Sequence, residues 1–508
     1  MSLSNLKIVI VGGVAGGMSA ATRARRLGET ALITVLEKGP HISFANCGLP
    51  YALGPVITDR NALLLHTPTT VKHRFDIDVK TDTEVTNIDR RNHTVDVLNL
   101  RTKTVRQVPY DKLVLAMGAE PYVPRIEGLD SPKVFSLHTI PDLDQIREFI
   151  RNTSPKRAVV IGGGFIGLEA AENIHQLGLH VSIVERESQV FATVDSDIAA
   201  RLHNEIRRNG VSLFLNASVK SITRSGATIL NDGTSIPADL VLIVVGSRPR
   251  TELARKTGLE LNSLADGIAV NACMQTSDPN IYAIGDAAAT HHRISLTTSP
   301  LLLAGPANRQ GRLAADHIFG RRSIYKGNVG THICKVFDLV VGGVGLSVRS
   351  LKALGRNYQY ITVHQPHHSR YYPGAENITV RLVFEKMTGK ILGAQAVGKA
   401  GVDKRVDVLA TAMQADMTVF DLEELELGYS PPFGAAKDAV NMAGFVAGNV
   451  MRGDVEIVHP EDIGMGETAF VDVRSQQEFE KGHVNNAINI PVDDLRARVG
   501  ELRSSQRT

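Results

Sequence analysis

The sequence predicts an α/β fold built around two dinucleotide-binding units. An apolar β run, a glycine-rich turn, a helical pattern and a second β run ending in glutamate follow one another at residues 7–37, and the same series recurs at residues 158–185. Such a βαβ series binds the pyrophosphate of a dinucleotide at the N-terminus of its helix. Since the chain carries the series twice, we expect it to hold two dinucleotides.

The first unit has the turn Gly12-Gly13-Val14-Ala15-Gly16-Gly17, followed by a helix that we expect at Met18–Leu27. Gly12, Gly16 and Gly17 allow a tight turn and a close approach of the pyrophosphate. The strand after the helix, Ala31–Leu36, ends at Glu37, about twenty residues after the last glycine, where a carboxylate takes the ribose hydroxyls. Val14 stands where the fingerprint has its central glycine.

The second unit matches the fingerprint at all three glycines, Gly162, Gly164 and Gly167, and its second strand ends at Glu185. A carboxylate at this position accepts both ribose hydroxyls of NAD and repels the extra phosphate of NADP. Arg186, directly beside it, weakens that preference. The alternative is a duplicated scaffold in which one of the two sites is inactive.

A single cysteine follows the first unit, in the stretch Ser43–Tyr51. Cys47 has no second cysteine at dithiol spacing, because the other two are Cys273 and Cys334. A lone thiolate must pair with a sulfur of the substrate or be oxidised to a sulfenic acid. The alternative is a buried structural cysteine. Its neighbours favour chemistry, since Asn46 offers polar contacts and Gly48 is expected to let a cofactor approach the backbone.

Two further stretches extend the pattern. A strand ends in small residues at Gly118, and a turn and strand lead to Gly285-Asp286, where the carboxylate can hydrogen-bond a polyol chain such as a ribityl. Together with the two βαβ units, these stretches resemble the flavin- and pyridine nucleotide-dependent disulfide reductases. The resemblance implies a glutathione reductase-like fold with FAD in the first unit and NADH in the second, NADPH being less favoured.

Within that family, Ser43–Tyr51 resembles the single-cysteine branch, which contains coenzyme A-disulfide reductases, NADH-dependent persulfide reductases, NADH oxidases and NADH peroxidases. The oxidases and peroxidases carry a histidine in the first glycine loop, where this chain has Val14-Ala15. The continuation Cys-Gly-Leu-Pro-Tyr resembles the coenzyme A-disulfide and persulfide reductases. The resemblance therefore implies reduction of a persulfide or disulfide by Cys47, with an oxidase or peroxidase cycle as the alternative.

Two segments near the C-terminus, 368–374 and 427–433, resemble those that bring tyrosines into the partner subunit's active site in this family. By position these are Tyr371 and Tyr429, with Tyr372 left open as an alternative to Tyr371. The resemblance implies a homodimer with shared active sites. A third hypothesis, from a different class, is a flavin-binding interaction protein whose redox state signals to a partner.

Coenzyme A, as substrate or bound ligand, needs cations for its phosphates. Arg23 matches the family position that reaches the nucleotide, and Ser43 and Asn46 flank the thiol end. Asn308 and Arg312 are four residues apart in a helical stretch, so they share a face. Taken alone, each basic residue is more typical of a solvated surface.

The domain map follows from these motifs. We expect an FAD-binding domain at 1–118 and 250–325, an NAD(H)-binding domain at 119–249 inserted into it, and an α+β dimerisation domain at 326–450. The last of these should contain the strands Gly330–Phe337, Tyr358–His364, Thr379–Glu385 and Ile391–Val397 and a helix at Lys404–Ala415. Residues 460–508 resemble the front half of a rhodanese module, without its catalytic cysteine loop, since no cysteine follows Cys334.

Composition excludes other classes. A net charge of +3 gives no electrostatic footprint for nucleic acid. Three unpaired cysteines in 508 residues and the absence of a bilayer-length apolar stretch indicate a cytoplasmic protein. His364, His367 and His368 lie in a loop-like stretch without a cysteine or carboxylate cluster, so we expect no metal site.

Overall fold

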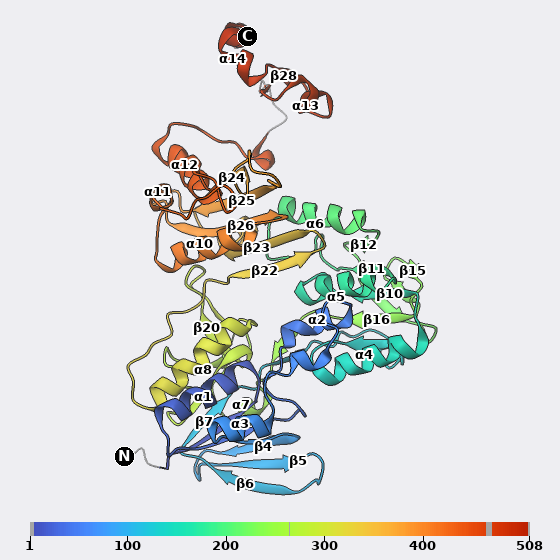
Figure 1. Cartoon of the computed structure of the whole chain (residues 1–508), viewed down its shortest axis with the longest axis vertical. Helices are drawn as coiled ribbons and strands as arrows, with labels where there is room; N and C mark the ends of the chain where they lie inside the picture. The colour runs from blue at the N-terminus through green and yellow to red at the C-terminus, as the bar shows by residue number, and fades with distance from the viewer. Residues whose placement is uncertain (1–4, 264, 464–469, 506–508) are drawn as a thin grey trace. The chain divides into compact units, whose positions relative to one another are not determined.

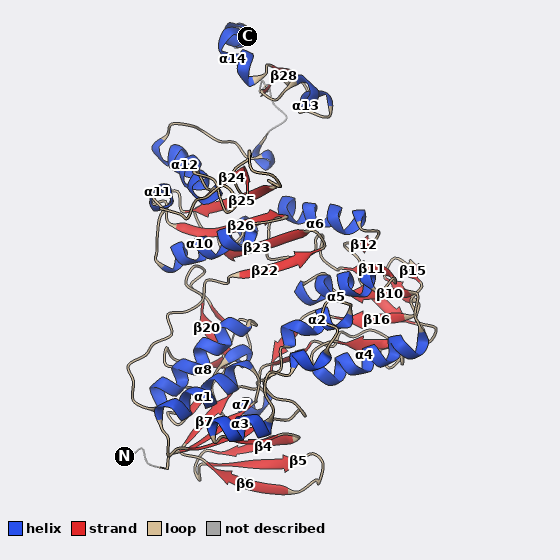
Figure 2. Cartoon of the chain, in the orientation of Figure 1, coloured by secondary structure: helices blue, strands red, loops and turns tan. Residues whose placement is uncertain are grey.

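The structure is a computed structural model that describes residues 5–263, 265–463 and 470–505. The chain divides into two compact units, Met1–Met451 and Arg452–Thr508, coloured along the chain in Figure 1. The larger unit contains three five-stranded sheets, drawn in red in Figure 2.

The first sheet is parallel and has the strand order β19-β7-β1-β2-β3. Its strands are β1 (Lys7–Val11), β2 (Leu32–Leu36), β3 (Asp78–Lys80), β7 (Lys112–Leu115) and β19 (Ile281–Ala283). Two helices that pack closely on each other, α1 (Ala15–Leu27) and α8 (Ala304–Ile318), accompany this sheet. Helix α1 begins three residues before the predicted start, because the Met18 amide already donates to the Val14 carbonyl.

The second sheet repeats this arrangement, with the order β12-β11-β10-β16-β9. Its strands are β9 (Val134–Ser136), β10 (Arg157–Ile161), β11 (His180–Val184), β12 (Ser212–Phe214) and β16 (Leu240–Ile243). The helices in this part of the chain are α4 (Ile140–Thr153), α5 (Phe165–Gln176) and α6 (Ser196–Arg208). β10, α5 and β11 are the βαβ series read from the sequence.

A short antiparallel ribbon joins β8 (Ala119–Pro121) to β17 (Ser247–Pro249). The chain runs through β8 between the first and second sheets and returns through β17, so both crossings lie side by side. Residues 5–325 also contain three small sheets. One is made of β4 (Thr83–Asp89), β5 (Thr94–Asn99) and β6 (Val105–Pro109), the next of β13 (Val219–Ile222), β14 (Thr228–Leu230) and β15 (Ser235–Ile236), and the last of β18 (Ile268–Ala269), β20 (Ala288–His291) and β21 (Thr298–Ser299). The shorter helices here are α2 (Leu49–Leu53), α3 (Pro68–Phe75) and α7 (Glu252–Lys256).

The third sheet is antiparallel, with the order β22-β23-β26-β25-β24. Its strands are β22 (His332–Val336), β23 (Leu339–Gly345), β24 (Gln359–Pro366), β25 (Asn377–Phe384) and β26 (Ile391–Gly398), and its helices are α9 (Val348–Ala353), α10 (Val402–Gln414), α11 (Val419–Glu423) and α12 (Ala439–Arg452). Sequence analysis predicted four of these strands. It missed β23 because the apolar run continues through a tight hairpin, in which Phe337 adopts the left-handed conformation at φ 53°.

A buried polar cluster connects the third sheet to the second βαβ region. Asp195, just before α6, accepts hydrogen bonds from the Arg381 guanidinium at 3.2 Å and the Gln395 amide at 2.7 Å. The Asp195 backbone amide donates to Gln395 in return, at 2.7 Å. Because buried polar groups with satisfied partners resist displacement, this cluster holds β25 and β26 in place against the start of α6.

The smaller unit contains β27 (Val471–Asp472) paired in parallel with β28 (Ile488–Asn489), together with α13 (Gln476–Glu480) and α14 (Val492–Ser505). Asp472 and Arg474 form an ion pair, and Arg474 also donates to the Gly482 carbonyl at 2.8 Å. Throughout the described residues, every helix is too short or too polar to span a bilayer.

Candidate active site

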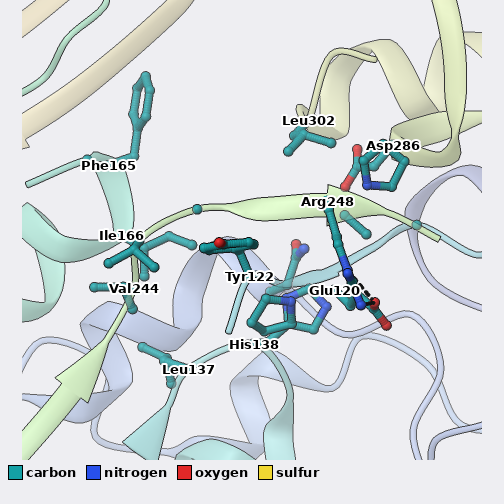
Figure 3. A pocket seen from close by; sticks show the side chains of 18 of the residues that line it. Glu120, Tyr122, Leu137, His138, Phe165, Ile166, Val244, Arg248, Asp286 and Leu302 are labelled. Carbon is teal, nitrogen blue, oxygen red and sulfur yellow. Dashed lines mark hydrogen bonds and ion pairs between the residues drawn. The ribbon is translucent and has the colours of Figure 1, made fainter. Parts of the chain in front are cut away.

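A cavity of about 1690 Å³ lies between the first and second sheets. It is larger than the roughly 300–1,000 Å³ of pockets that hold one drug-sized ligand. Residues of both glycine turns line it, and so does Cys47. Figure 3 shows Asp286 and Leu302 facing this hollow from one side and Ile166 and Val244 from the other, with the Arg248–Glu120 ion pair of the β17–β8 ribbon beside them. The cavity thus brings both predicted nucleotide sites and the cysteine together.

Both glycine turns share two features, a left-handed backbone conformation at the first glycine and a close approach of the helix to the turn at the last glycine. Gly12 and Gly162 have φ of +105° and +112°, a region that favours glycine. A Cβ on Gly17 or Gly167 would lie 1.9 Å from the carbonyl oxygen of Gly12 or Gly162, respectively. These two glycines therefore let the helix pack on its own turn, whereas Gly12, Gly16, Gly162 and Gly164 line the cavity itself.

The glutamate at the end of each second strand binds its own glycine turn. Glu37 accepts from the Gly13 amide at 2.7 Å and from the Gly39 amide at 2.7 Å. Glu185 likewise accepts from the Gly163 amide at 2.6 Å and the Glu187 amide at 2.8 Å. Burial raises the pKa of Glu37, while the two amide hydrogen bonds oppose the rise. Both carboxylates line the cavity, so they are placed to meet a ribose.

Asp286 and Gly118, which were predicted for FAD, and Gly164 of the second turn also fit a dinucleotide. Asp286 lines the cavity, and burial raises the pKa of its carboxyl to about 6. A buried carboxyl of this kind can accept hydrogen bonds from the hydroxyls of a ligand. Gly118, at φ +67°, and Gly164 each face open space where a side chain would be. The residues present therefore fit FAD at the first turn and NAD(H) at the second.

Cys47 lies in a 3₁₀ turn, Asn46–Gly48, that leads into α2. The thiol is exposed, and the Cys47 amide donates to the Asn46 side chain at 3.0 Å. The expectation for Gly48 was wrong. Gly48 is buried, and an added Cβ would lie 2.4 Å from the Leu63 side chain, so its missing side chain makes room for Leu63 rather than for a cofactor.

An acidic side chain that sequence analysis did not single out also lines the cavity. Glu169, on α5, accepts a hydrogen bond from the Tyr51 hydroxyl at 2.9 Å. Burial raises the pKa of Glu169, while the Tyr51 hydrogen bond opposes the rise. The sequence signal was its place on the same helix, two residues after Gly167. The hydrogen bond links α5 of the second unit to α2, which carries the cysteine turn.

The two predicted tyrosines are brought together on the third-sheet part of the unit. Their hydroxyls lie 3.1 Å apart, and the side chains of Tyr371 and Tyr429 are 76% and 49% exposed. Neither lines the cavity, and Tyr372 is less exposed, at 41%. Mutual hydrogen bonding raises the pKa of Tyr371 and lowers that of Tyr429. A pair of exposed phenols is available to a neighbouring molecule.

The residues predicted for coenzyme A form two groups: Ser43 and Asn46 lie in the cysteine stretch, whereas Arg23, Asn308 and Arg312 lie on α1 and α8, which pack closely on each other. Asn46 lines the cavity, whereas the Arg23 guanidinium is paired with Asp316 at 2.6 Å. Asn308 accepts from the Ser19 hydroxyl, and Arg312 is exposed. Ser43 joins the first glycine turn through its amide, which donates to the Gly13 carbonyl at 2.9 Å. These assignments stay predictions.

The histidines read from the sequence have local partners. His364 bonds the Thr379 hydroxyl, and the His367 ring accepts from the Glu376 amide. Within the described ranges, no group of three or more histidine, cysteine or acidic side chains is arranged to hold a metal ion. Cys334 is buried on β22, as expected, and burial beside Glu169 and Glu172 raises its thiol pKa.

Two nucleotide turns and one exposed cysteine on a shared cavity define a flavin- and pyridine nucleotide-dependent oxidoreductase. Residues 6–307, more than half of the chain, match the pyridine nucleotide-disulphide oxidoreductase family, and residues 331–440 match its dimerisation domain. The chain belongs to this family. Residues 460–507 match the rhodanese-like domain, as the sequence predicted.

Three known proteins illustrate the relationship. The coenzyme A disulfide reductase of Staphylococcus haemolyticus is 36% identical over 442 residues, which are 87% of this chain and 99% of that protein. The crystal structure of reduced Bacillus anthracis CoADR-RHD superposes with a TM-score of 0.96 at 42% identity, covering 98% of this chain and 90% of the other. The structure of an NAD-dependent persulfide reductase from A. fulgidus superposes with a TM-score of 0.92 at 34% identity. The match covers 98% of this chain and 92% of the other.

Proposed function

We propose that this protein uses NADH to reduce the sulfur–sulfur bond of a coenzyme A persulfide or disulfide through Cys47. The observation that carries the proposal is the shared cavity, which both glycine turns and the exposed Cys47 line. The names of its relatives support the substrate class. The rhodanese-like segment favours a persulfide, because such modules handle sulfane sulfur.

Each residue has a role in this reaction. The Cys47 thiolate attacks one sulfur of the substrate, and the other sulfur leaves with its electron pair as a thiol or as hydrosulfide. FAD, when bound, relays two electrons from NADH to the sulfur centre. Two-electron reduction of the disulfide or persulfide on Cys47 would then break its sulfur–sulfur bond, release the outer sulfur as a thiol or hydrosulfide, and restore the Cys47 thiolate. The sum is one NADH and one proton consumed for each sulfur–sulfur bond cleaved.

The cofactor assignments follow the two turns. Gly12, Gly16, Glu37, Gly118 and Asp286 hold FAD in this proposal. The second turn, with Glu185, holds the nicotinamide nucleotide, and its carboxylate favours NADH over NADPH. Arg186 also lines the cavity and weakens this preference, because its ion pair with Glu187 at 3.1 Å is exposed and therefore weak.

The active enzyme in this proposal is a homodimer in which Tyr371 and Tyr429 reach the partner's Cys47 region. Their exposure and the match to the dimerisation domain support this arrangement. Each phenol can donate a hydrogen bond to sulfur as charge develops there. Substrate phosphates would meet Arg23 and Arg312, with Ser43, Asn46 and Asn308 as polar contacts.

The decisive experiment replaces Cys47. Cys47→Ser should abolish turnover of coenzyme A persulfide and coenzyme A disulfide, while FAD stays bound and is still reduced by NADH in stopped-flow absorbance measurements. Cys273→Ser, which changes a thiol outside the cavity, serves as the matched control and should keep normal turnover. Measuring kcat/KM with NADH and with NADPH tests Glu185 in the same assay.

A Cys47→Ser variant that reduces coenzyme A persulfide at a near-normal rate would overturn the mechanism. Faster NADH consumption with oxygen or peroxide than with either sulfur substrate would favour the oxidase or peroxidase alternative. Absence of turnover with every acceptor would favour a signalling role.

A further inference from the structure

Phe433 is a large apolar side chain that lies in contact with solvent. The residue is 73% exposed and follows Tyr429 by four positions in the same loop. Together with Tyr371, whose hydroxyl lies 3.1 Å from that of Tyr429, it forms an exposed aromatic group. Burying a phenylalanine side chain contributes about 1.5–3 kcal/mol, and aromatic residues are enriched where proteins meet. The group therefore has the composition of an interaction surface.

The loop presents Phe433 in a fixed backbone conformation. The Phe433 amide donates to the Ser430 carbonyl at 2.8 Å, and the Phe433 carbonyl accepts from the Lys404 ammonium at 3.3 Å. The carbonyl of the next residue, Gly434, accepts from the Ser369 amide at 2.9 Å, which ties this loop to the other tyrosine loop. Because its backbone is already ordered, Phe433 loses little conformational entropy when it meets a partner.

An exposed apolar side chain also lies near the cysteine turn. Leu65 is 63% exposed, and its amide donates to the Ser43 carbonyl at 3.1 Å. Segments 43–45 and 63–65 pair antiparallel at this point. Ser43 precedes Cys47 by four residues, which span at most about 14 Å. Leu65 is therefore a neighbour of the Cys47 site.

We infer that Phe433 of one copy packs against the partner's Leu65 and closes one side of the partner's Cys47 site with an apolar wall. This inference rests on the proposed function, since it requires the homodimer in which Tyr429 reaches the partner's Cys47. Phe433 belongs to the segment, residues 331–440, that matches the dimerisation domain. At most about 14 Å of chain separates it from Tyr429, so docking of the Tyr429 hydroxyl brings the two apolar side chains into the same region.

A cross-linking test asks whether the two side chains meet between copies. One chain carries Leu65→Cys and the other carries Phe433→Cys. Cys47→Ser and Cys273→Ser in both chains leave the buried Cys334 as the only native thiol. The two chains are co-expressed, loaded with FAD and treated with a short bismaleimide. We expect mass spectrometry to find position 65 of one chain linked to position 433 of the other.

The matched control replaces Leu65→Cys with Val56→Cys. Val56 is an exposed apolar residue nine positions after Cys47, and the inference does not place it at the contact. Linking of position 433 to position 56 should therefore be much weaker than linking to position 65.

Kinetics give a second test that needs no added thiol. Phe433→Ala and Leu65→Ala should each lower kcat/KM for coenzyme A persulfide by about five- to tenfold, because loss of the wall lets the cysteine turn and the tyrosine loop shift. The double variant should lose no more than about tenfold, since the second truncation removes a contact already lost. Independent effects would instead multiply to about 25- to 100-fold. Val105→Ala, on β6, truncates an exposed valine elsewhere and should leave kcat/KM within about twofold.

Preferential linking to position 56, linking to neither position, or multiplied losses in the double variant would each overturn the inference while leaving the homodimer intact. Native mass spectrometry of the unaltered enzyme separates this case from failure of the proposed function. A fully active monomer would overturn the shared active site of the proposed function, and the inference with it.

Discussion

Asp286 is an acid held in a place that disfavours its charge. Burial raises its carboxyl pKa from the ordinary 3.8 to about 6. Because the folded apoprotein then binds this proton more tightly than the unfolded chain, the free energy of unfolding falls as the pH rises from about 4 to 6. The difference between the two pKa values corresponds to at most about 3 kcal/mol, at about 1.4 kcal/mol per pKa unit.

Asp286→Asn should therefore stabilise the apoprotein at pH 7 by up to about 3 kcal/mol, with the gain disappearing near pH 4. It should also weaken FAD binding about 10- to 100-fold, since a hydrogen bond to a charged acceptor contributes about 1.5–3 kcal/mol. Thermal unfolding of FAD-free protein at several pH values and titration with FAD would measure both effects. The exposed Asp130→Asn is the control. Unchanged FAD affinity would contradict the role of Asp286.

Side chains of helix α10 hydrogen-bond to the two loops that carry Tyr371 and Tyr429. The Arg405 side chain, only 2% exposed, pairs with Asp438 at 2.6 Å and donates to the His367 carbonyl at 2.7 Å. Lys404 donates to the Gly428 and Phe433 carbonyls, on either side of Tyr429, at 3.4 and 3.3 Å. Figure 1 shows α10 beside β23 and β26, against which it packs. One helix thus positions the loops of both Tyr371 and Tyr429, whose hydroxyls are in contact although the two residues are 58 positions apart in the sequence.

Lys404→Met removes two hydrogen bonds that hold the loop of Tyr429. It should lower kcat for the sulfur substrate by roughly two- to tenfold, because a small displacement of the Tyr429 hydroxyl reduces catalysis. The rate of flavin reduction by NADH should not change. Arg405 is less suitable for substitution, since removing its side chain would leave the Asp438 carboxylate buried without a partner. That change would lower the free energy of unfolding by about 3–5 kcal/mol.

The matched control is Lys399→Met, the same chemical change at a lysine whose described ion pair is a 3.9 Å contact with Asp338. Steady-state kinetics and stopped-flow flavin reduction on both variants separate the two steps. A loss of kcat equal in the two variants would mean that the contacts of Lys404 do not position Tyr429.

At the scale of the whole molecule, the proposed homodimer predicts that the tyrosine pair of one copy completes the active site of the other. Mixing Cys47→Ser with the double variant Tyr371→Phe/Tyr429→Phe should restore activity, although each is inactive alone. The heterodimer unites one intact Cys47 with both tyrosines of the other chain, so one of its two equivalent sites works. Its activity should reach about half that of the unaltered dimer.

Native mass spectrometry would establish subunit exchange, and turnover of coenzyme A persulfide would measure recovery. Exchange of subunits without recovered activity would show that the tyrosines act within their own chain or not at all.

Local sequence determined much of the fold and part of the site. The two glycine turns with Glu37 and Glu185 could be read directly, because a tight turn, a helix start and a strand end are separated by few residues and depend on neighbours in the chain. The position of Cys47 was equally plain. Element ends were less so, as α1 shows, because turn glycines can also form the first helical turn.

Tertiary structure decided which distant residues share a site. It brought Glu169 to Tyr51, Tyr371 to Tyr429 and His332 to Phe165, pairs more than 50 residues apart that follow no local period. It also gave the Arg23 guanidinium a partner, Asp316, that lies 293 residues away. Periodicity and spacing describe the faces of single elements, whereas the packing of sheets and helices against one another determines which faces meet.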